Sequence, residues 1–340
     1  MRFGWDVPNV HHGFGLDAYA FGDVYAESVA VTVPTIEQVS ARAEQIGFDT
    51  IWIADHVVFP DRSVVEHLLR YRPNSGRGDD AADGHAVRSQ DPVFEAITTM
   101  SYLAGRTRRC RIGVGVLVIP YRHPLLAAKM LATLDVLSRG RIIVAAGVGW
   151  LKEAFDALGA DYVNRGPITD EYLDLMRTVW RSADPHFDGR FIRIPPGLRV
   201  HPTPVQEPSI PIWIGGVSGR ALRRAAARGD GWLGVYQPVE ATRELHGRLR
   251  GLLDQAGRSA DDFVFAHRVR FQVTDADGGD QPCIGSPRRI ADGIRRYHEA
   301  GVDHLVLAPP PGPTTAYLLE QLDRFEHDVR PLIEDLWNAR

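Results

Sequence analysis

The sequence predicts an α/β fold, a (β/α)8 TIM barrel with insertions after strands 1 and 2 and before strand 5. Eight short apolar runs alternate with amphipathic stretches along the 340 residues, an order that favours a parallel sheet. Eight strands are the number that closes such a barrel. The turn after the first run, Trp5-Asp6-Val7-Pro8-Asn9, lacks the glycines that a doubly wound open sheet requires there, and that open sheet is the alternative architecture.

The strands are expected where the apolar runs lie. The run from Ile142 to Ala146 has no polar alternation, which suits a parallel strand covered on both faces. We expect all the strands to belong to one barrel, a single domain over residues 1–340. The expected strands span residues 2–7, 50–55, 111–119, 141–147, 211–215, 231–235, 263–274 and 303–308.

Helices are expected between the strands, because apolar residues there recur every three or four positions and so share one face. Glycine marks the end of three of them, at Gly47, Gly140 and Gly301. Ser286-Pro287 supplies an N-cap and a first-turn proline to the third. The apolar faces consist of Ile36, Val39, Ala43 and Ile46, of Ala127, Met130, Leu131 and Leu134, and of Ile290, Ile294 and Tyr297.

A last helix is predicted near the C-terminus from a regular apolar stripe. We expect the stripe to pack on the barrel wall. A homodimer seam is the alternative, but Pro331 should bend the helix and argues against a long coiled coil. The stripe consists of Leu318, Leu322, Phe325, Val329, Leu332 and Leu336.

Three insertions interrupt the alternation. Residues 9–33 and 57–91 follow the first two strands, on the side where barrel loops carry chemistry. A loop as long as the second is typical of a lid or a substrate wall, with partial disorder as the alternative. Residues 184–210 contain six prolines around Phe191-Ile192-Arg193-Ile194 and predict a short hairpin with an extended connector.

The composition excludes several classes of protein. With 44% hydrophobic residues, 24% charged residues and a net charge of −4, the chain shows no sign of disorder, a membrane span or a hold on nucleic acid, so a small-molecule substrate is expected. Cys110 and Cys283 have no ligand-spaced partner and indicate neither a disulfide framework nor zinc. No apolar stretch of signal-peptide length follows Met1, which favours a cytoplasmic location.

The dipeptide Asp55-His56 is the first candidate for chemistry. It lies at the expected C-terminal end of the second strand, where barrel enzymes build their sites. An imidazole with a pKa of about 6.5 exchanges protons at neutral pH, and an adjacent carboxylate can hold its charged form. The alternative is a histidine bonded to backbone and lid. Asp303-His304 repeats the dipeptide at the start of a strand, the stability end, where we expect a structural role.

Glycines next to strands form the second set of candidates. Gly113 and Gly115 lie inside the third strand, which indicates a bulge or the close approach of another group. Gly147-Val148-Gly149-Trp150 follows the fourth strand. Gly215-Gly216-Val217-Ser218 precedes a predicted helix, and the free N–H groups at the start of a helix attract phosphate. The arginines at 220, 223, 224 and 228 lie on this helix. We expect most of them to be solvated and at most one to reach an anion.

These segments together resemble the luciferase-like monooxygenases, the flavin- and deazaflavin-dependent family that includes bacterial luciferase. The resemblance implies a barrel that binds FMN or the deazaflavin coenzyme F420 in its C-terminal mouth, with the ring against the third strand and a non-prolyl cis peptide at Gly115-Val116. It runs through residues 51–56, 112–150, 165–180, 201–232 and 285–307.

The resemblance also implies roles for individual residues. In deazaflavin-using relatives an Asp-His pair after the second strand lies beside the reacting ring, and Asp55-His56 matches it, which favours F420. His56 is then the proton donor or acceptor, Asp55 orients or binds the coenzyme, and Glu153 is a candidate second acid. The coenzyme-binding residues implied are Asp55, Gly115, Val116, Gly147, Gly149, Trp150, Gly215, Gly216, Val217 and Ser218.

Several alternatives stay open at this point. Within the family, the rival is a monooxygenase that receives reduced FMN from a partner reductase and uses oxygen. Outside it, a non-catalytic flavin carrier would bind coenzyme without turnover. A metal-dependent barrel hydrolase is a distant alternative, because His11-His12 has no third ligand at readable spacing. The substrate is expected to be a small organic molecule that the sequence does not identify.

Overall fold

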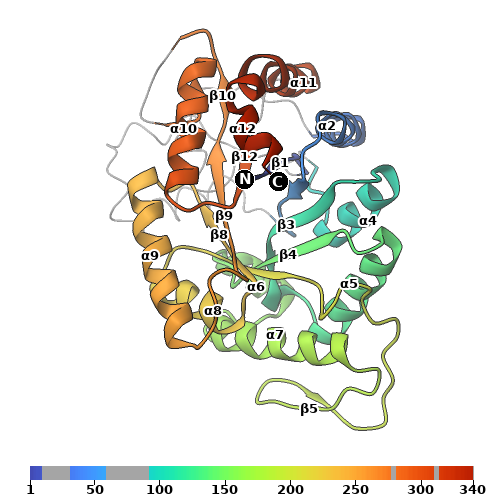
Figure 1. The fold of residues 1–340 in the computed structure, drawn as a ribbon. Coiled ribbons are helices and arrows are strands. Elements are labelled where there is room, and N and C mark those ends of the chain that lie inside the picture. The colour runs from blue at the N-terminus through green and yellow to red at the C-terminus, as the bar shows by residue number, and fades with distance from the viewer. Residues whose placement is uncertain (10–30, 59–91, 277–280, 310–313, 340) are drawn as a thin grey trace.

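Eight parallel strands form a closed barrel in the computed structural model of the chain, with helices around its outside (Figure 1). The structure describes residues 1–9, 31–58, 92–276, 281–309 and 314–339. The strands follow one another around the barrel in the order β1, β2, β3, β4, β7, β8, β9 and β12. The predicted (β/α)8 barrel is therefore confirmed.

Each predicted run contains one barrel strand. The long run over 263–274 is divided, because β9 ends at Arg270 and β10, Gln272–Val273, pairs with β11, Ile284–Gly285, in a separate parallel pair. The barrel strands are β1 Arg2–Asp6, β2 Thr50–Ile53, β3 Arg111–Val118, β4 Ile142–Gly147, β7 Ile212–Gly215, β8 Gly231–Val235, β9 Val264–Arg270 and β12 His304–Ala308.

The strands lack polar alternation because both of their faces are buried. In β4, Ile143 and Ala145 belong to the core inside the barrel, whereas Ile142 and Val144 belong to the larger core between strands and helices. Successive strand side chains point to opposite faces, so a strand between two cores needs apolar residues at every position. The inner core also contains Trp52, Trp213, Leu233, Ala266 and Val306.

The helices begin and end where local sequence signals place them. Thr32 caps α2 by accepting the N–H of Thr35, and Gly47 ends it with φ 96°. Ser286 caps α10 in the same way. The helices are α2 Val33–Ile46, α4 Ala96–Arg106, α5 Pro124–Ser138, α6 Lys152–Leu158, α7 Arg165–Arg181, α8 Gly219–Arg228, α9 Val239–Gln255, α10 Pro287–Glu299, α11 Thr315–Arg324 and α12 Glu334–Asn338.

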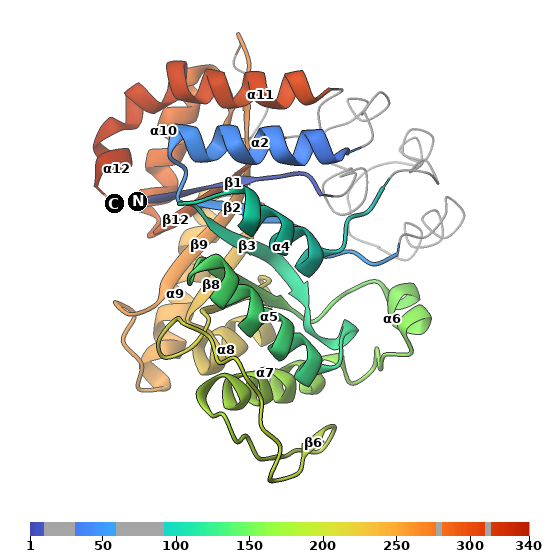
Figure 2. The same ribbon diagram turned by 90° about the vertical axis from the view of Figure 1, so that its right-hand side faces the viewer.

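The C-terminal segment packs on the barrel wall as predicted, beside α2 (Figure 2). It is not one helix, because a π-helical turn, Phe325–Val329, and a 3-10 turn, Arg330–Ile333, separate α11 from α12 around Pro331. These turns rotate the apolar stripe. Ile333 is buried in place of Leu332, which is 40% exposed, so the stripe position expected at Leu332 was wrong.

The remaining predicted insertion is also present. Strand β5, Phe187–Asp188, pairs antiparallel with β6, Arg193–Ile194, and forms the expected short hairpin, which projects away from the barrel (Figures 1 and 2). The insertions predicted at 9–33 and 57–91 lie almost wholly outside the described residues. No helix in the described part of the chain is long and apolar enough to cross a membrane.

Candidate active site

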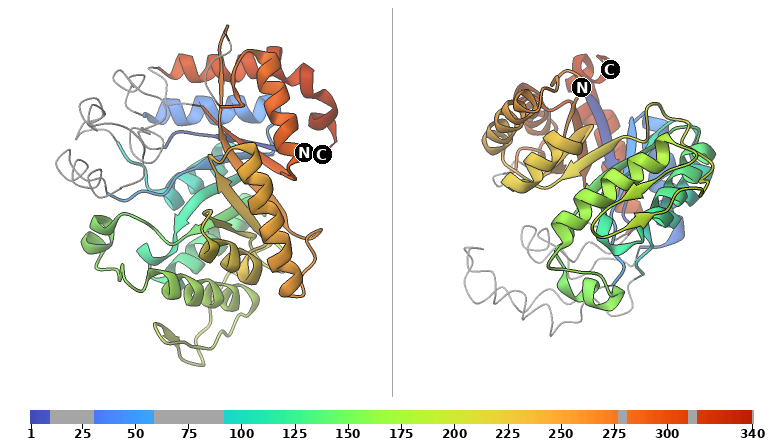
Figure 3. Two further views of the ribbon diagram at one scale, coloured as in Figure 1. Left: turned by 90° about the vertical axis from the view of Figure 1, so that its left-hand side faces the viewer. Right: turned by 90° about the horizontal axis from the view of Figure 1, so that it is seen from below.

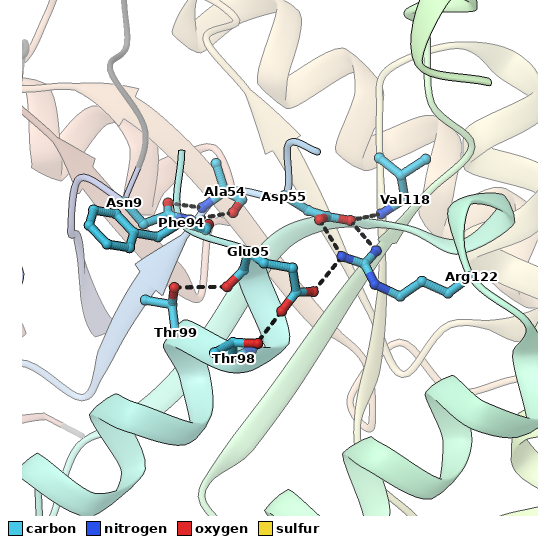
Figure 4. Close-up of polar contacts among 9 residues, drawn as sticks. All are labelled: Asn9, Ala54, Asp55, Phe94, Glu95, Thr98, Thr99, Val118 and Arg122. Atoms are coloured by element: carbon cyan, nitrogen blue, oxygen red, sulfur yellow. Dashed lines mark hydrogen bonds and ion pairs between the residues drawn. The ribbon is translucent and has the colours of Figure 1, made fainter. Parts of the chain in front are cut away.

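The carboxylate of Asp55 is immobilised just beyond the end of β2 (Figure 4). Arg122 donates to both of its oxygens at 2.7 Å, and the backbone N–H of Val118 donates to Oδ2 at 2.9 Å. The Asp55 side chain is fully buried. A bidentate guanidinium–carboxylate pair of this kind fixes geometry as well as charge. Asp55 therefore fastens the end of β2 to the end of β3.

Arg122 extends this connection to α4. Its Nη2 atom also donates to Oε1 of Glu95 at 2.7 Å, and Glu95 caps α4 by accepting the N–H of Thr98. Burial acts to raise the pKa of Glu95, but hydrogen bonds from Thr98 and Arg122 outweigh it and lower the pKa. Burial acts to lower the pKa of Arg122, but Asp55 and Glu95 hold it above its ordinary value. Glu95 and Arg122 are therefore charged at neutral pH.

Asn9 provides a further brace at the same edge. Its side-chain amide donates to the carbonyls of Ala54 and Phe94 at 2.8 and 3.0 Å, and its oxygen accepts the N–H of Ala54 at 2.8 Å. Asn9 itself is fully buried. The backbone just before His56 is thus held from two sides, and His56 follows it as a half-buried residue at the C-terminal edge of the barrel.

Strand β3 carries an irregularity at the predicted position. Gly115 pairs with Ala145 and Leu117 with Ala146, so Val116 is an extra residue, as in a β-bulge. The peptide bond Gly115-Val116 is cis, which confirms the bond expected from the family resemblance. Val116 thereby leaves the regular ladder and lies over the neighbouring strand ends.

Val116 gives two of the predicted glycines a packing reason. A Cβ atom on Gly147 or on Gly215 would overlap a methyl group of Val116. A Cβ atom on Gly115 would lie 3.0 Å from Nη2 of Arg268, and a Cβ atom on Gly113 would overlap Trp52. These four glycines make room for side chains of the protein itself, and their contact with a coenzyme stays a prediction.

The segment after β4 brings Gly149, Trp150 and Glu153 to the same end of the barrel, where α6 lies (Figure 2). Gly149 has φ 76°, and a Cβ there would lie 2.7 Å from Val118, so glycine is required. Trp150 is 43% exposed. Oε2 of Glu153 is buried and accepts no hydrogen bond from the described residues. A buried carboxylate oxygen without a donor can accept a hydrogen bond from a ligand hydroxyl.

The N-terminus of α8 forms a second polar centre. Ser218 caps the helix by accepting the N–H of Ala221 at 3.2 Å, after Gly216 with φ 107°. A Cβ atom on Gly219 would lie 3.6 Å from both Nη1 of Arg223 and Nη2 of Arg248. Two guanidinium groups thus flank the helix start, whose free N–H groups already favour an anion.

The other helical arginines point elsewhere. Arg224 pairs with Asp170 at 2.6 Å and Arg228 with Asp174 at 2.9 Å, both across to α7. Arg220 and Arg223 are exposed, as expected of solvated arginines, whereas Arg224 and Arg228 are half-buried in these ion pairs, which was not expected. That at most one of the four reaches an anion stays a prediction. Arg248 was missed, because it comes from α9 and no local pattern links it to this turn.

A buried ion pair lies inside the barrel below Gly115. Asp6, at the end of β1, lies 3.1 Å from Nη2 of Arg268 on β9. Burial raises the pKa of Asp6 to about 6, and the charge of Arg268 opposes this rise. Sequence reasoning did not select either residue. Arg122 was not selected from the sequence either. It follows β3 and the 3-10 turn Ile119–Tyr121, and a charged residue just after a barrel strand is a signal of a functional site.

Two other expectations concern metals and the second Asp-His pair. No group of three or more metal-ligating side chains occurs among the residues that the structure describes. His11 and His12 lie outside those residues. His304 is 1% exposed at the start of β12, and its ring contacts the rings of Trp52 and Trp213. It lies at the end of the barrel opposite His56, as expected of a structural histidine.

A family model described as luciferase-like monooxygenase matches residues 1–278. The chain belongs to this family. An FMNH2-dependent dimethylsulfone monooxygenase of Pseudomonas putida is 32% identical over 304 residues, covering 74% of this chain and 81% of that protein. An uncharacterized protein of Mycobacterium tuberculosis is 29% identical over 266 residues, covering 78% and 81%. The protein is therefore an F420- or flavin-dependent oxidoreductase or monooxygenase of the luciferase-like class.

Solved structures with a similar fold include users of both coenzymes. An F420-dependent secondary alcohol dehydrogenase in complex with an F420-acetone adduct aligns with a TM-score of 0.72 and 17% identity over 98% of both chains. A riboflavin lyase with modified FMN and riboflavin aligns with a TM-score of 0.78 and 15% identity over 100% of this chain and 92% of that one. At these identities the likeness shows the fold alone.

Proposed function

We propose that this luciferase-like enzyme transfers a hydride between coenzyme F420 and a small organic substrate. The observation that carries the proposal is the Asp55-His56 pair, in which Asp55 is fixed by Arg122 and Val118 while His56 follows at the C-terminal edge of the barrel. A proton donor must be held in place to act on a developing charge. The ion pair provides that rigidity, and His56 provides the proton.

The residues present fit a coenzyme of this class. F420 and FMN both carry a phosphate on their ribityl chain, and the N-terminus of α8 offers helix N–H groups, Ser218 and the guanidinium groups of Arg223 and Arg248. We propose that this end holds the phosphate, with the ring over the bulge at Val116. The further contacts proposed come from Gly115, Gly147, Gly149, Trp150, Gly215, Gly216 and Val217.

Three residues of the chain have proposed roles in hydride transfer: His56, Asp55 and Glu153. When bound, F420 supplies a ring carbon that accepts or donates hydride. His56 would take or give the proton that accompanies hydride transfer, at an imidazole nitrogen. Asp55, whose oxygens are already occupied by Arg122 and Val118, acts as a positioning residue. Glu153, with one buried oxygen lacking a donor, is the proposed second acid.

A second candidate function is a two-component monooxygenase that uses reduced FMN and oxygen. The observation that favours it is the relative of known activity, since the FMNH2-dependent dimethylsulfone monooxygenase is 32% identical. This function would use the same phosphate site and would need a reductase partner to supply reduced FMN. The two candidates differ in the coenzyme bound, so binding distinguishes them.

A fluorescence titration of the protein with F420 and with oxidised and reduced FMN tests the proposal. Tight binding of F420 and weak binding of FMN is the expected result. Preference for reduced FMN would select the monooxygenase, and binding of neither would refute both. With F420 bound, His56→Ala is expected to lower turnover at least about tenfold with little change in coenzyme affinity. His123→Ala, an exposed histidine just after Arg122, is the matched control.

A further inference from the structure

A cavity of about 430 Å3 lies at the end of the barrel where the strands begin. This is the end opposite the proposed coenzyme site, near the two chain termini (Figure 3). Its wall includes the first residues of β1, β3 and β12, namely Arg2, Arg111 and His304, and its floor includes Trp213 and Ile143 of the inner core. We name it the basal cavity.

The basal cavity is lined by cations whose charges are incompletely matched. Arg2 forms no ion pair with any described residue, and Arg111 donates to the neutral oxygens of Gln206 and Ile142. Arg109 is a third guanidinium on the wall. Burial, followed by the positive charge of Arg2, lowers the pKa of Arg111. Like charges held around a cavity repel each other, and a bound anion would relieve that repulsion.

The carboxylates of the basal cavity are directed at the main chain. Oε1 of Glu44 accepts the N–H groups of Arg108, Arg109 and Cys110 at 2.7 to 3.0 Å. Oδ2 of Asp49 accepts the N–H of Phe3 at 2.8 Å. These hydrogen bonds close the turns around the cavity. Within the described residues the charge of Arg2 thus has no ion-pair partner, and Arg111 donates to neutral oxygens.

His304 contributes a hydrogen-bond donor with a defined tautomer. The indole N–H of Trp52 donates to Oγ1 of Thr50 at 2.7 Å, and the same Oγ1 lies 2.9 Å from Nε2 of His304. The indole nitrogen can only donate, and no other described residue bonds this Oγ1, so we assign the hydroxyl proton of Thr50 to Nε2. Burial and the two arginines lower the pKa of His304 to about 3, so the ring is neutral and carries its proton on Nδ1. Within the described chain, Nδ1–H has no acceptor.

We propose that the basal cavity binds a tetrahedral oxyanion, either inorganic phosphate or the phosphate group of a small ester, between Arg2, Arg111 and Nδ1–H of His304. Two guanidinium groups and one N–H donor match the acceptor oxygens of such an anion. The bound anion would link the beginnings of β1, β3 and β12. It would therefore stabilise the barrel from the end that takes no part in the proposed hydride transfer.

Isothermal titration of the full chain with inorganic phosphate, at constant ionic strength in chloride, tests this proposal. Arg2→Gln is expected to weaken phosphate binding about fivefold, as the loss of one charge-assisted hydrogen bond implies. Arg108→Gln removes a neighbouring exposed charge that does not line the cavity and should leave binding unchanged. Equal affinity in the two variants, or no saturable heat with phosphate, would overturn the proposal.

The N-terminus of α8 also suits phosphate, so the titration is repeated with Arg248→Gln. Loss of phosphate binding in that variant, with normal binding in Arg2→Gln, would assign the bound anion to the coenzyme site and also overturn the proposal. Phenyl phosphate distinguishes the two sources of the anion. Tighter binding than inorganic phosphate would support an ester whose organic part lies against Trp213, and equal binding would support the free ion.

Discussion

Replacing Arg122 with Gln is expected to destabilise the protein strongly. Three hydrogen bonds of 2.7 Å connect this guanidinium to Asp55 and Glu95. The Asp55 side chain is 0% exposed and that of Arg122 is 14% exposed, whereas Glu95 is 38% exposed. The substitution leaves the Asp55 carboxylate buried with the N–H of Val118 as its remaining donor among the described residues.

The size of the effect follows from this burial. Opposite charges about 4 Å apart attract by about 4 kcal/mol at the effective dielectric constant typical of protein sites. Removing one partner of a buried pair costs about 3 to 5 kcal/mol, because the other charge stays buried without compensation. The contribution from Glu95 is smaller, since water screens it. We expect Arg122→Gln to lower the free energy of unfolding by about 3 to 4 kcal/mol.

Urea unfolding followed by circular dichroism measures the loss. Arg106→Gln is the matched control, because Arg106 pairs with Glu37 at 3.0 Å while 58% exposed, and surface pairs contribute about 0 to 1 kcal/mol. Asp55→Asn combined with Arg122→Gln removes both charges and should recover part of the loss. Equal losses for Arg122→Gln and Arg106→Gln would refute the reasoning.

Three further predictions concern other parts of the barrel. Burial raises the pKa of Asp6 from 3.8 to about 6, so between these pH values the folded chain holds a proton that the unfolded chain has lost. The free energy of unfolding should therefore fall by about 3 kcal/mol as pH rises through this window. In urea titrations at several pH values, Asp6→Asn should lack the fall. Gly215→Ala should lower Tm, because the new methyl group overlaps Val116 at a cost of about 1 to 3 kcal/mol. Adding Val116→Ala removes the overlapping methyl groups and should restore most of the loss. If the double variant shows no recovery, this clash is excluded. Arg248→Gln should weaken coenzyme binding about fivefold in the fluorescence titration. Arg243→Gln, on the same helix, is the control. Equal coenzyme affinities of the two variants would remove Arg248 from the site.

The barrel could be predicted because its signals are local. A parallel strand buried on both faces is an apolar run, as in Ile142–Gly147, and a helix cap such as Thr32 or Ser286 lies next to the helix that it starts. The C-terminal helix was predicted less well. Its apolar stripe assumed a constant 3.6-residue turn, and the π-helical turn at Phe325–Val329 changes which later residues face the core.

The site was predictable in its positions and less so in its contacts. Asp55 was selected because it ends a strand, yet its partner Arg122 lies 67 residues away and comes from another strand end. Arg248 reaches the start of α8 in the same way, from the next helix. Such pairings depend on how strands and helices meet in space, and no periodicity within one element records them. Gly147 and Gly215 show the reverse case, in which a visible pattern has a packing cause in Val116.

The bulge at Val116 reverses the sides to which the later N–H groups of β3 point. Before it, the N–H of Arg111 points to β2 and bonds the carbonyl of Asp49, while the N–H of Ile112 points the other way, to Arg141 at the start of β4. In an unbroken strand every even-numbered residue after Ile112 would also direct its N–H toward β4. Val118 instead directs its N–H to Asp55 on the β2 side. If Val116 lay in the regular ladder, this N–H would turn toward β4, so the bulge sets the direction from which Asp55 is held.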